Sequence, residues 1–96
     1  MKKIIFVVTI EEIHDRAMYI EYIRQVAGII QAHSGEYIAR SDKITPFGGD
    51  PPERSIIIAF DSMEEAKGCF FSEEYKDIKH LRENSTRSRA FFIEND

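Results

Sequence analysis

The sequence predicts a single α+β domain over residues 1–96, with a four-stranded antiparallel sheet and two helices on one of its faces. Three observations carry this prediction. The apolar patterns follow the order strand, helix, strand, strand, helix, strand. Two of the strands are apolar on both faces, and the chain has only enough helix to cover one face of the sheet. This order is that of the ferredoxin-like βαββαβ sandwich, in which right-handed crossovers place the first and third strands side by side at the centre.

The two strands that are apolar on both faces set the expected assembly. The first spans residues 3–10 and the third spans residues 54–60, and residues 4–10 and 56–60 do not alternate between apolar and polar. A strand with one face in water should alternate. The face left without helices would be a large exposed apolar patch, which soluble monomers avoid. We therefore expect a second copy of the chain to cover it, giving a homodimer.

The first helix is predicted over residues 15–33, where apolar side chains recur at spacings of three and four. This stripe consists of Ile20, Ile23, Ala27 and Ile30. Gly35 is expected to end the helix in the left-handed conformation that many C-caps need. Residues 36–41 form the second strand. Regular alternation puts Tyr37 and Ala39 on one face of it, and Ile38 on the other face with Glu36 and Arg40.

The second helical region begins with a capping box, in which Ser62 accepts from a free backbone N–H and Glu65 reaches back. A second start at residues 72–74 predicts a break in the helix near Phe71 and Ser72. Residues 89–94 form the last strand. Between the second and third strands, residues 42–53 contain paired glycines and paired prolines, which predict a loop.

Composition excludes several classes of protein. Hydrophobic residues at 43% and charged residues at 31% are typical of an ordinary soluble domain. The net charge of -4 argues against a nucleic-acid binder, which needs a basic face. No segment approaches the ~18 apolar residues of a membrane span. The apolar run after Lys3 stops at Glu11 without a cleavage site, so it is interpreted as a strand and not as a signal peptide. With Cys69 as the single cysteine, we expect a cytoplasmic protein.

An ordered set of short stretches resembles one known family, and the likeness covers nearly the whole chain. The stretches are Tyr19-Ile20-Glu21-Tyr22, residues 34–40, Pro52-Glu53-Arg54, residues 58–62, residues 72–76 and Leu81-Arg82. Together they resemble the domain-of-unknown-function family numbered thirteen-thirty, within the dimeric α+β barrel superfamily. The resemblance implies two ferredoxin-like subunits packed sheet against sheet. It implies no common reaction, so it supports the fold more than the function.

The chain departs from the pattern of this family at three positions. Ser34 stands where the family usually has the first of two glycines. Ala59 stands where the third strand often carries a carboxylate, and Phe70 lies near a position that favours Trp or Tyr. If the carboxylate is a general base in relatives, this chain has lost it.

Arg40 and Arg54 are the main candidate binding residues, and both match arginines of the family pattern. They flank the loop of residues 42–53, one at a strand end and one at a strand start. Two guanidinium groups close together could hold a carboxylate or a phosphate. A protein that is acidic overall would need such a local positive site to bind an anion. The alternative is that each arginine caps a sheet edge or pairs with an acidic residue.

Tyr75, His80 and Arg82 are lesser candidates for the same ligand site. Tyr75 could point its hydroxyl into a pocket or anchor the core. His80 could serve as a general acid or base, or lie exposed without a role. Arg82 could bind the ligand or pair with a glutamate. Cys69 is expected to be a buried apolar thiol.

The sequence indicates neither a metal nor a cofactor. Its three histidines are scattered and lack the spacing of metal ligands. Gly48-Gly49 lacks the Lys and Ser or Thr that follow in a phosphate-binding loop, so a nucleotide site is not expected.

Three functions remain open at this level. The first is a homodimer that binds a small molecule, with anions favoured. The second is a cofactor-independent isomerase or monooxygenase-like enzyme, which only the superfamily resemblance implies. The third is a module whose apolar sheet face serves assembly alone. A closed cavity with several polar side chains would favour the first two, and a perturbed carboxylate or histidine in it would favour the enzyme.

Overall fold

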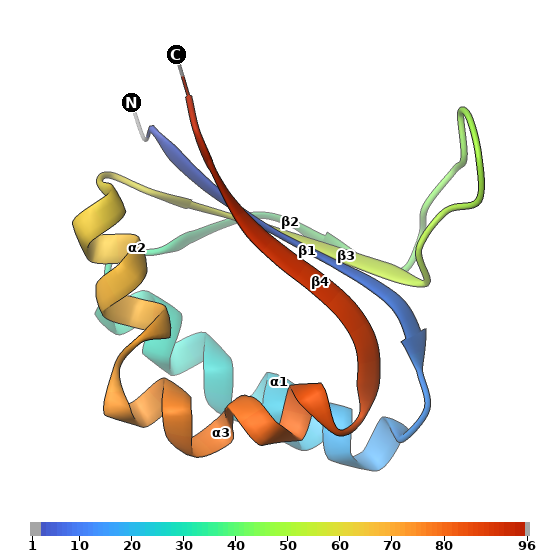
Figure 1. Ribbon diagram of the computed structural model, residues 1–96, viewed down its shortest axis with the longest axis horizontal. Helices are drawn as coiled ribbons and strands as arrows, with labels where there is room; N and C mark the ends of the chain where they lie inside the picture. Colours follow the sequence, from blue (N-terminus) through green and yellow to red (C-terminus); the bar gives the residue numbers. More distant parts are fainter. Residues whose placement is uncertain (1–2, 96) are drawn as a thin grey trace.

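The computed structural model describes residues 3–95. Its elements are β1 (Ile4–Ile13), α1 (Arg16–Ala32), β2 (Glu36–Ser41), β3 (Arg54–Phe60), α2 (Met63–Phe70), α3 (Glu73–Glu83) and β4 (Thr86–Glu94). The strands form one antiparallel sheet in the order β2-β3-β1-β4. All three helices lie on one face of this sheet (Figure 1). The predicted ferredoxin-like fold is confirmed, with β1 and β3 at the centre.

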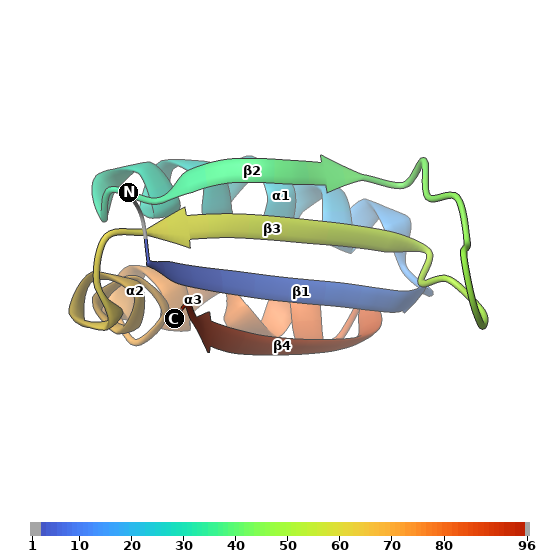
Figure 2. The same cartoon turned by 90° about the horizontal axis from the view of Figure 1, so that it is seen from above.

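The central strand β1 separates a buried face from an open one. Ile4, Phe6, Val8 and Ile10 face the helices and are nearly inaccessible to solvent. The side chains between them point to the opposite face of the sheet. This face is toward the viewer in Figure 2, and none of the helices formed by residues 3–95 covers it. There Val7 pairs with Ile57 on one side and with Phe91 on the other. The larger apolar side chains of this open face include Ile5, Val7, Ile57, Phe91 and Ile93.

A β-bulge in β2 changes which way the side chains of this strand point. Tyr37 pairs with Ile58 and Arg40 pairs with Ile56, with a register shift between Tyr37 and Ala39. Because of the extra residue, Tyr37 and Arg40 lie on the same face of the sheet, the one turned toward the helices. Regular alternation put them on opposite faces, so this part of the sequence prediction is wrong. A second bulge lies in β1 between Ile10 and Glu12.

The helices begin where side chains satisfy their free backbone N–H groups. Asp15 accepts from the N–H of Met18 at 3.1 Å and starts α1. Ser62 accepts from the N–H of Glu65 at 3.1 Å and starts α2, as predicted. Ser72 accepts from the N–H of Tyr75 at 3.1 Å and starts α3. The predicted break in the second helical region is therefore confirmed, between Phe70 and Glu73.

The turn after α1 reverses the roles expected of its two small residues. Ser34 takes the left-handed conformation, with φ of 63°. Gly35 is needed for space, because a Cβ there would come within 2.5 Å of Ile30 Cγ2 and 2.8 Å of the Phe60 ring. The expectation that Gly35 is the left-handed residue is therefore wrong. The glycine instead lets β2 leave close to the end of α1.

The core between the helices and the sheet is aromatic at one end. Phe70 of α2 stacks on Phe6 with ring centroids 4.0 Å apart and forms T-shaped contacts with Phe60 and Tyr75.

Within residues 3–95, no helix combines the length and apolar character that crossing a membrane requires.

Candidate functional site

A cavity of about 40 Å³ lies between α1 and the helix-facing side of the sheet. This volume holds roughly three water-sized groups, at about 10–15 Å³ each. Most of its wall is apolar and comes from α1, β1 and β3. The polar lining consists of Tyr19, Tyr22, Tyr37, Arg40, Arg54 and Arg82. The arrangement places guanidinium and phenol groups from α1, β2, β3 and α3 around one small space.

Arg40 reaches the cavity from the end of β2. Its Cζ lies 4.2 Å from the centre of the Tyr37 ring, close enough for a cation–π contact. The bulge in β2 makes this contact possible, since it turns both side chains toward the helices. The residue as a whole is exposed, so Arg40 stands at the rim of the cavity.

Arg54 enters the cavity from the first position of β3. Its Nε is buried and has no hydrogen-bond partner within residues 3–95. The guanidinium lies near Tyr19, where it lowers the pKa of that phenol, although the larger effect of burial leaves the pKa raised. A buried donor without a partner is costly, so this Nε is available to a ligand oxygen.

Arg82 forms the third positive wall, in the last turn of α3. Its Nε donates to the Tyr75 hydroxyl at 3.3 Å, and its Nη1 donates to the Ser88 hydroxyl at 2.9 Å. The Tyr75 hydroxyl in turn lies 2.8 Å from that of Tyr22, which lines the cavity. Burial acts to lower the pKa of Arg82, but Tyr75 and Tyr22 outweigh it and the pKa is raised. The guanidinium is therefore charged, and its side-chain hydrogen-bond partners within residues 3–95 are hydroxyl groups.

The tyrosines of the cavity do not neutralise its arginines. Burial raises the pKa of Tyr19, Tyr22 and Tyr37, and the neighbouring arginines only partly oppose this effect. All three phenols are therefore protonated near neutral pH and act as hydrogen-bonding groups without charge.

The arginines outside the cavity differ from those inside it in their partners. Each outer arginine forms an ion pair with a glutamate, and these pairs are Arg16–Glu53, Arg24–Glu21, Arg87–Glu12 and Arg89–Glu11. Arg40, Arg54 and Arg82 form no ion pair with a carboxylate within residues 3–95. The cavity thus concentrates uncompensated positive charge in a protein whose net charge is -4.

The predicted site residues divide into three groups in the structure. Arg40, Arg54 and Arg82 line one cavity. Tyr75 lies one hydrogen bond behind it, in contact with both Tyr22 and Arg82. His80 is exposed on α3 and does not line the cavity.

Sequence reasoning missed three lining residues, Tyr19, Tyr22 and Tyr37. They lie on α1 and β2, and no motif in the sequence marks them as site residues. The available signal was their hydroxyl groups, since a buried tyrosine usually needs a hydrogen-bond partner.

Other candidate chemistry is not concentrated at one place. No group of His, Cys, Asp or Glu within residues 3–95 could hold a metal ion. Cys69 is fully buried, as expected, and burial raises the pKa of its thiol to about 12. A thiol that is protonated at neutral pH is a poor nucleophile.

Comparison with known proteins identifies the family of this chain. The sequence matches the family model described as "Domain of unknown function (DUF1330)" over residues 4–96. No curated protein matches it. Among solved structures, a protein of unknown function from Rhodopseudomonas palustris aligns with a TM-score of 0.79 at 11% identity, covering 100% of this chain and 85% of that chain.

Two further solved structures share the fold. SnoaB, a cofactor-independent oxygenase from Streptomyces nogalater, aligns with a TM-score of 0.62 at 9% identity, covering 100% of this chain and 95% of that chain. A dimeric protein of unknown function with a ferredoxin-like fold, from Bacteroides fragilis, aligns with a TM-score of 0.61 at 8% identity, covering 95% of each chain. At these identities the likeness concerns the fold alone.

Proposed function

The chain belongs to the DUF1330 family, and we propose that it is a homodimer that binds a small carboxylate in the arginine-lined cavity of each subunit. The observation that carries the proposal is the uncompensated charge of Arg40, Arg54 and Arg82. Guanidinium groups in such a position can bind an anion, and a carboxylate can accept from their N–H groups in pairs. Arg54 supplies a buried donor that is without a partner in residues 3–95.

The rest of the cavity wall favours a carboxylate with an apolar part over inorganic phosphate. Phe6, Val8, Ile23, Val26 and Ile56 line it together with the polar groups. A phosphate would present oxygens to this wall, where they would lose hydration without gaining hydrogen bonds. A short carboxylic acid places its two oxygens at the arginines and its carbons against the apolar residues.

The lining supports binding more than catalysis. Within residues 3–95, the cavity wall contains no histidine and no carboxylate. Its phenols have raised pKa values, so they are weak general bases near neutral pH. The alternative function is that of a cofactor-independent oxygenase, because SnoaB, which has the same fold, is described as one. Oxygen uptake in the presence of a bound acid would favour that alternative.

The homodimer is supported by the open face of the sheet. Val7 and Ile57 lie at its centre and Phe91 and Ile93 lie along β4 beside them. The Bacteroides fragilis neighbour, which has the same fold, is described as dimeric. A second copy placed on this face would remove the apolar patch from water at about 25 cal/mol per Å². A cytoplasmic location stays a prediction.

The ligand proposal is tested by thermal shift and calorimetry with acetate, propionate and phosphate. The short carboxylic acids should raise the melting temperature of the wild type by mass action, and phosphate should do so less. Arg40→Ala and Arg54→Ala should lose this response. Arg24→Ala removes an exposed arginine of α1 and should keep it, which makes it the matched control. Equal responses of all variants would mean that the cavity arginines are structural.

The assembly is tested by light scattering coupled to size exclusion. The wild type should show about twice the chain mass of 11.2 kDa. Val7→Lys puts a charge at the centre of the open face and should give a folded monomer, because a buried unpaired charge is strongly unfavourable. Ile20→Lys, at an exposed position of α1, should remain dimeric. A wild type of single chain mass at micromolar concentration would refute the homodimer.

A further inference from the structure

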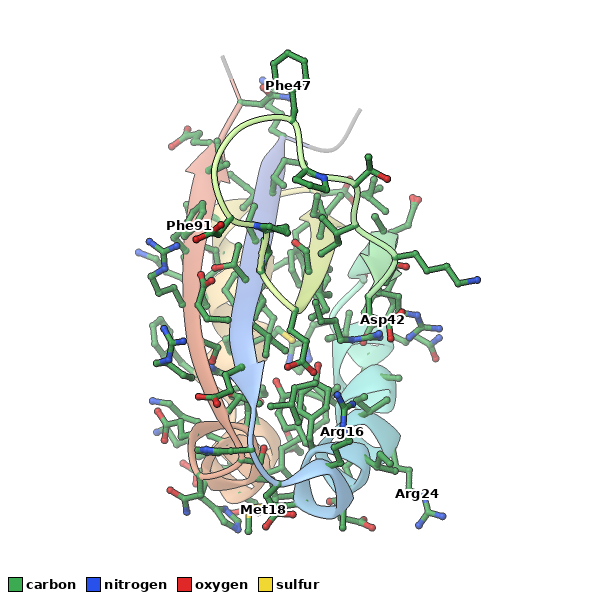
Figure 3. All side chains as sticks on the ribbon, turned by 90° about the vertical axis from the view of Figure 1, so that its right-hand side faces the viewer. Arg16, Met18, Arg24, Asp42, Phe47 and Phe91 are labelled. Atoms are coloured by element: carbon green, nitrogen blue, oxygen red, sulfur yellow. The ribbon has the colours of Figure 1, made fainter. Side chains whose placement is uncertain are left out.

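The loop of residues 42–53 presents one aromatic side chain entirely to solvent. Phe47, at its tip, is 107% exposed, the largest value among the exposed apolar residues. In Figure 1 the loop rises from the ends of β2 and β3 on the side of the sheet away from the helices. Figure 3 shows Phe47 at the end of the molecule opposite to α1 and α3. The side chain therefore projects past the open face.

Hydrogen bonds to the rest of the subunit fix the two ends of this loop but not its middle. Ser41 accepts from the N–H of Lys43 at 2.9 Å, and Glu53 donates its N–H to Ile10 at 2.8 Å. Between them, residues 44–52 form no hydrogen bond or ion pair with the described residues, 3–95. A projecting loop with a fixed base and a bare aromatic tip has the form of a docking element.

We propose that this loop docks on the second subunit of the homodimer, with Phe47 as the anchoring side chain. The inference rests on the proposed homodimer. A subunit stacked on the open face would lie beside the loop, because both are on the same side of the sheet. In a dimer with two-fold symmetry each loop would contact the partner in the same way, so Phe47 contributes twice. Aromatic side chains are frequent anchors of interfaces.

The size of the open face supports a contribution from the loop. Four strands about 4.8 Å apart, on average about eight residues long at ~3.3 Å per residue, give a flat footprint of about 510 Å². A stable interface buries about 800 Å² of accessible surface on each partner. Side-chain relief raises the accessible area of the sheet above its footprint, and the loop supplies a further part.

The same loop connects the interface to the cavity. It follows Ser41, one residue after Arg40, and ends at Glu53, one residue before Arg54. Docking on the partner would fix the course of the loop and, with it, Arg40 at the cavity rim. We therefore expect ligand binding to be tighter in the dimer than in the monomer.

The test compares Phe47→Ser with Phe71→Ser, since Phe71 is also exposed but lies where α2 meets α3. Dilution series followed by light scattering give the dimer dissociation constant. Phe47→Ser should raise this constant by about 30-fold or more. Phe47→Ser should also reduce the rise in melting temperature that propionate causes. Phe71→Ser should match the wild type in both, and circular dichroism should show an unchanged fold for each.

The outcomes separate this inference from the proposed homodimer. A wild type that stays monomeric overturns the homodimer and the docking together. A wild-type dimer whose dissociation constant is unchanged in Phe47→Ser overturns the docking alone. A variant that loses the propionate response with an unchanged dissociation constant places the loop over its own cavity, and this also overturns the docking.

Discussion

The guanidinium of Arg40 lies over the ring of Tyr37, with its Cζ 4.2 Å from the ring centroid, although the two residues are three positions apart in one strand. In a regular strand such residues point to opposite faces. The bulge between Tyr37 and Ala39 brings them together. One inserted residue therefore gives the cavity its rim arginine and the aromatic surface that holds it.

Arg82→Met should separate stability from ligand binding. The guanidinium of Arg82 is partly buried, and its side-chain hydrogen-bond partners within residues 3–95 are the hydroxyls of Tyr75 and Ser88. A buried charge without an opposite charge carries a desolvation penalty, which an apolar side chain of similar size avoids. We expect the free energy of unfolding in urea to stay the same or rise by about 1 kcal/mol, with the response to propionate lost. A fall of more than about 1 kcal/mol would show that Arg82 is structural.

Two glycine substitutions should have opposite effects. Gly35→Ala puts a Cβ within 2.5 Å of Ile30 and should lower the free energy of unfolding by about 1–3 kcal/mol. Gly28→Ala, on an exposed part of α1 with nothing within 4 Å, should raise it by about 0.5–1 kcal/mol. Urea midpoints measure both. Equal midpoints for the two variants would contradict the crowding at Gly35.

Removing the N-cap of α2 should lower the free energy of unfolding by a modest amount. Ser62→Ala removes the oxygen that accepts from the N–H of Glu65, and should cost about 1 kcal/mol. Thr45→Ala, in the exposed loop, should leave the urea midpoint unchanged. If Ser62→Ala also leaves it unchanged, solvent or another side chain supplies the cap.

Cys69 should contribute to loss of stability in alkali. Burial raises the pKa of its thiol to about 12, above the unfolded value of about 8.5. Below about pH 8.5 the thiol is protonated in both states. Above it, the unfolded chain loses a proton that the folded chain keeps, so the free energy of unfolding falls as the pH rises toward 12.

The measurement is urea unfolding at pH 7 and at pH 10. The thiol should account for about 1–2 kcal/mol of the decrease between them. Cys69→Ala should show a decrease smaller by this amount, whatever its stability at pH 7. An identical decrease in the variant and the wild type would show that other groups, such as the buried tyrosines, dominate.

The elements of the fold followed from the sequence because their signals are local. The apolar runs of β1 and β3 predicted the central strands, and the oxygens of Ser62 and Ser72 predicted two separate helix starts. The limits of β1 and β4 were less accurate. These strands pair through Ile13 and Thr86, beyond the predicted ends, because cross-strand hydrogen bonding continues past the apolar residues.

The site followed from the sequence only in part because its geometry is not local. Arg40 and Arg54 could be named from their positions beside the loop. Their common face depends on the bulge, which no residue pattern in β2 announces. Tyr75 joins the site through its contacts with Arg82 and with Tyr22, which is 53 residues away. Whether a tyrosine of an apolar stripe is core or cavity wall depends on such distant contacts.

The bulge in β2 has another consequence, for the behaviour of the chain at high concentration. β2 is an edge strand, and the backbone groups along its outer side are open to pairing with a strand of any other molecule. The irregular register between Tyr37 and Ala39 interrupts that row of N–H and C=O groups. At the opposite edge, β4 carries Arg87 and Arg89, and charged side chains on an edge strand hinder its pairing with a strand of another molecule. Both edges therefore resist fibrous aggregation, while the apolar face between them stays available to another subunit.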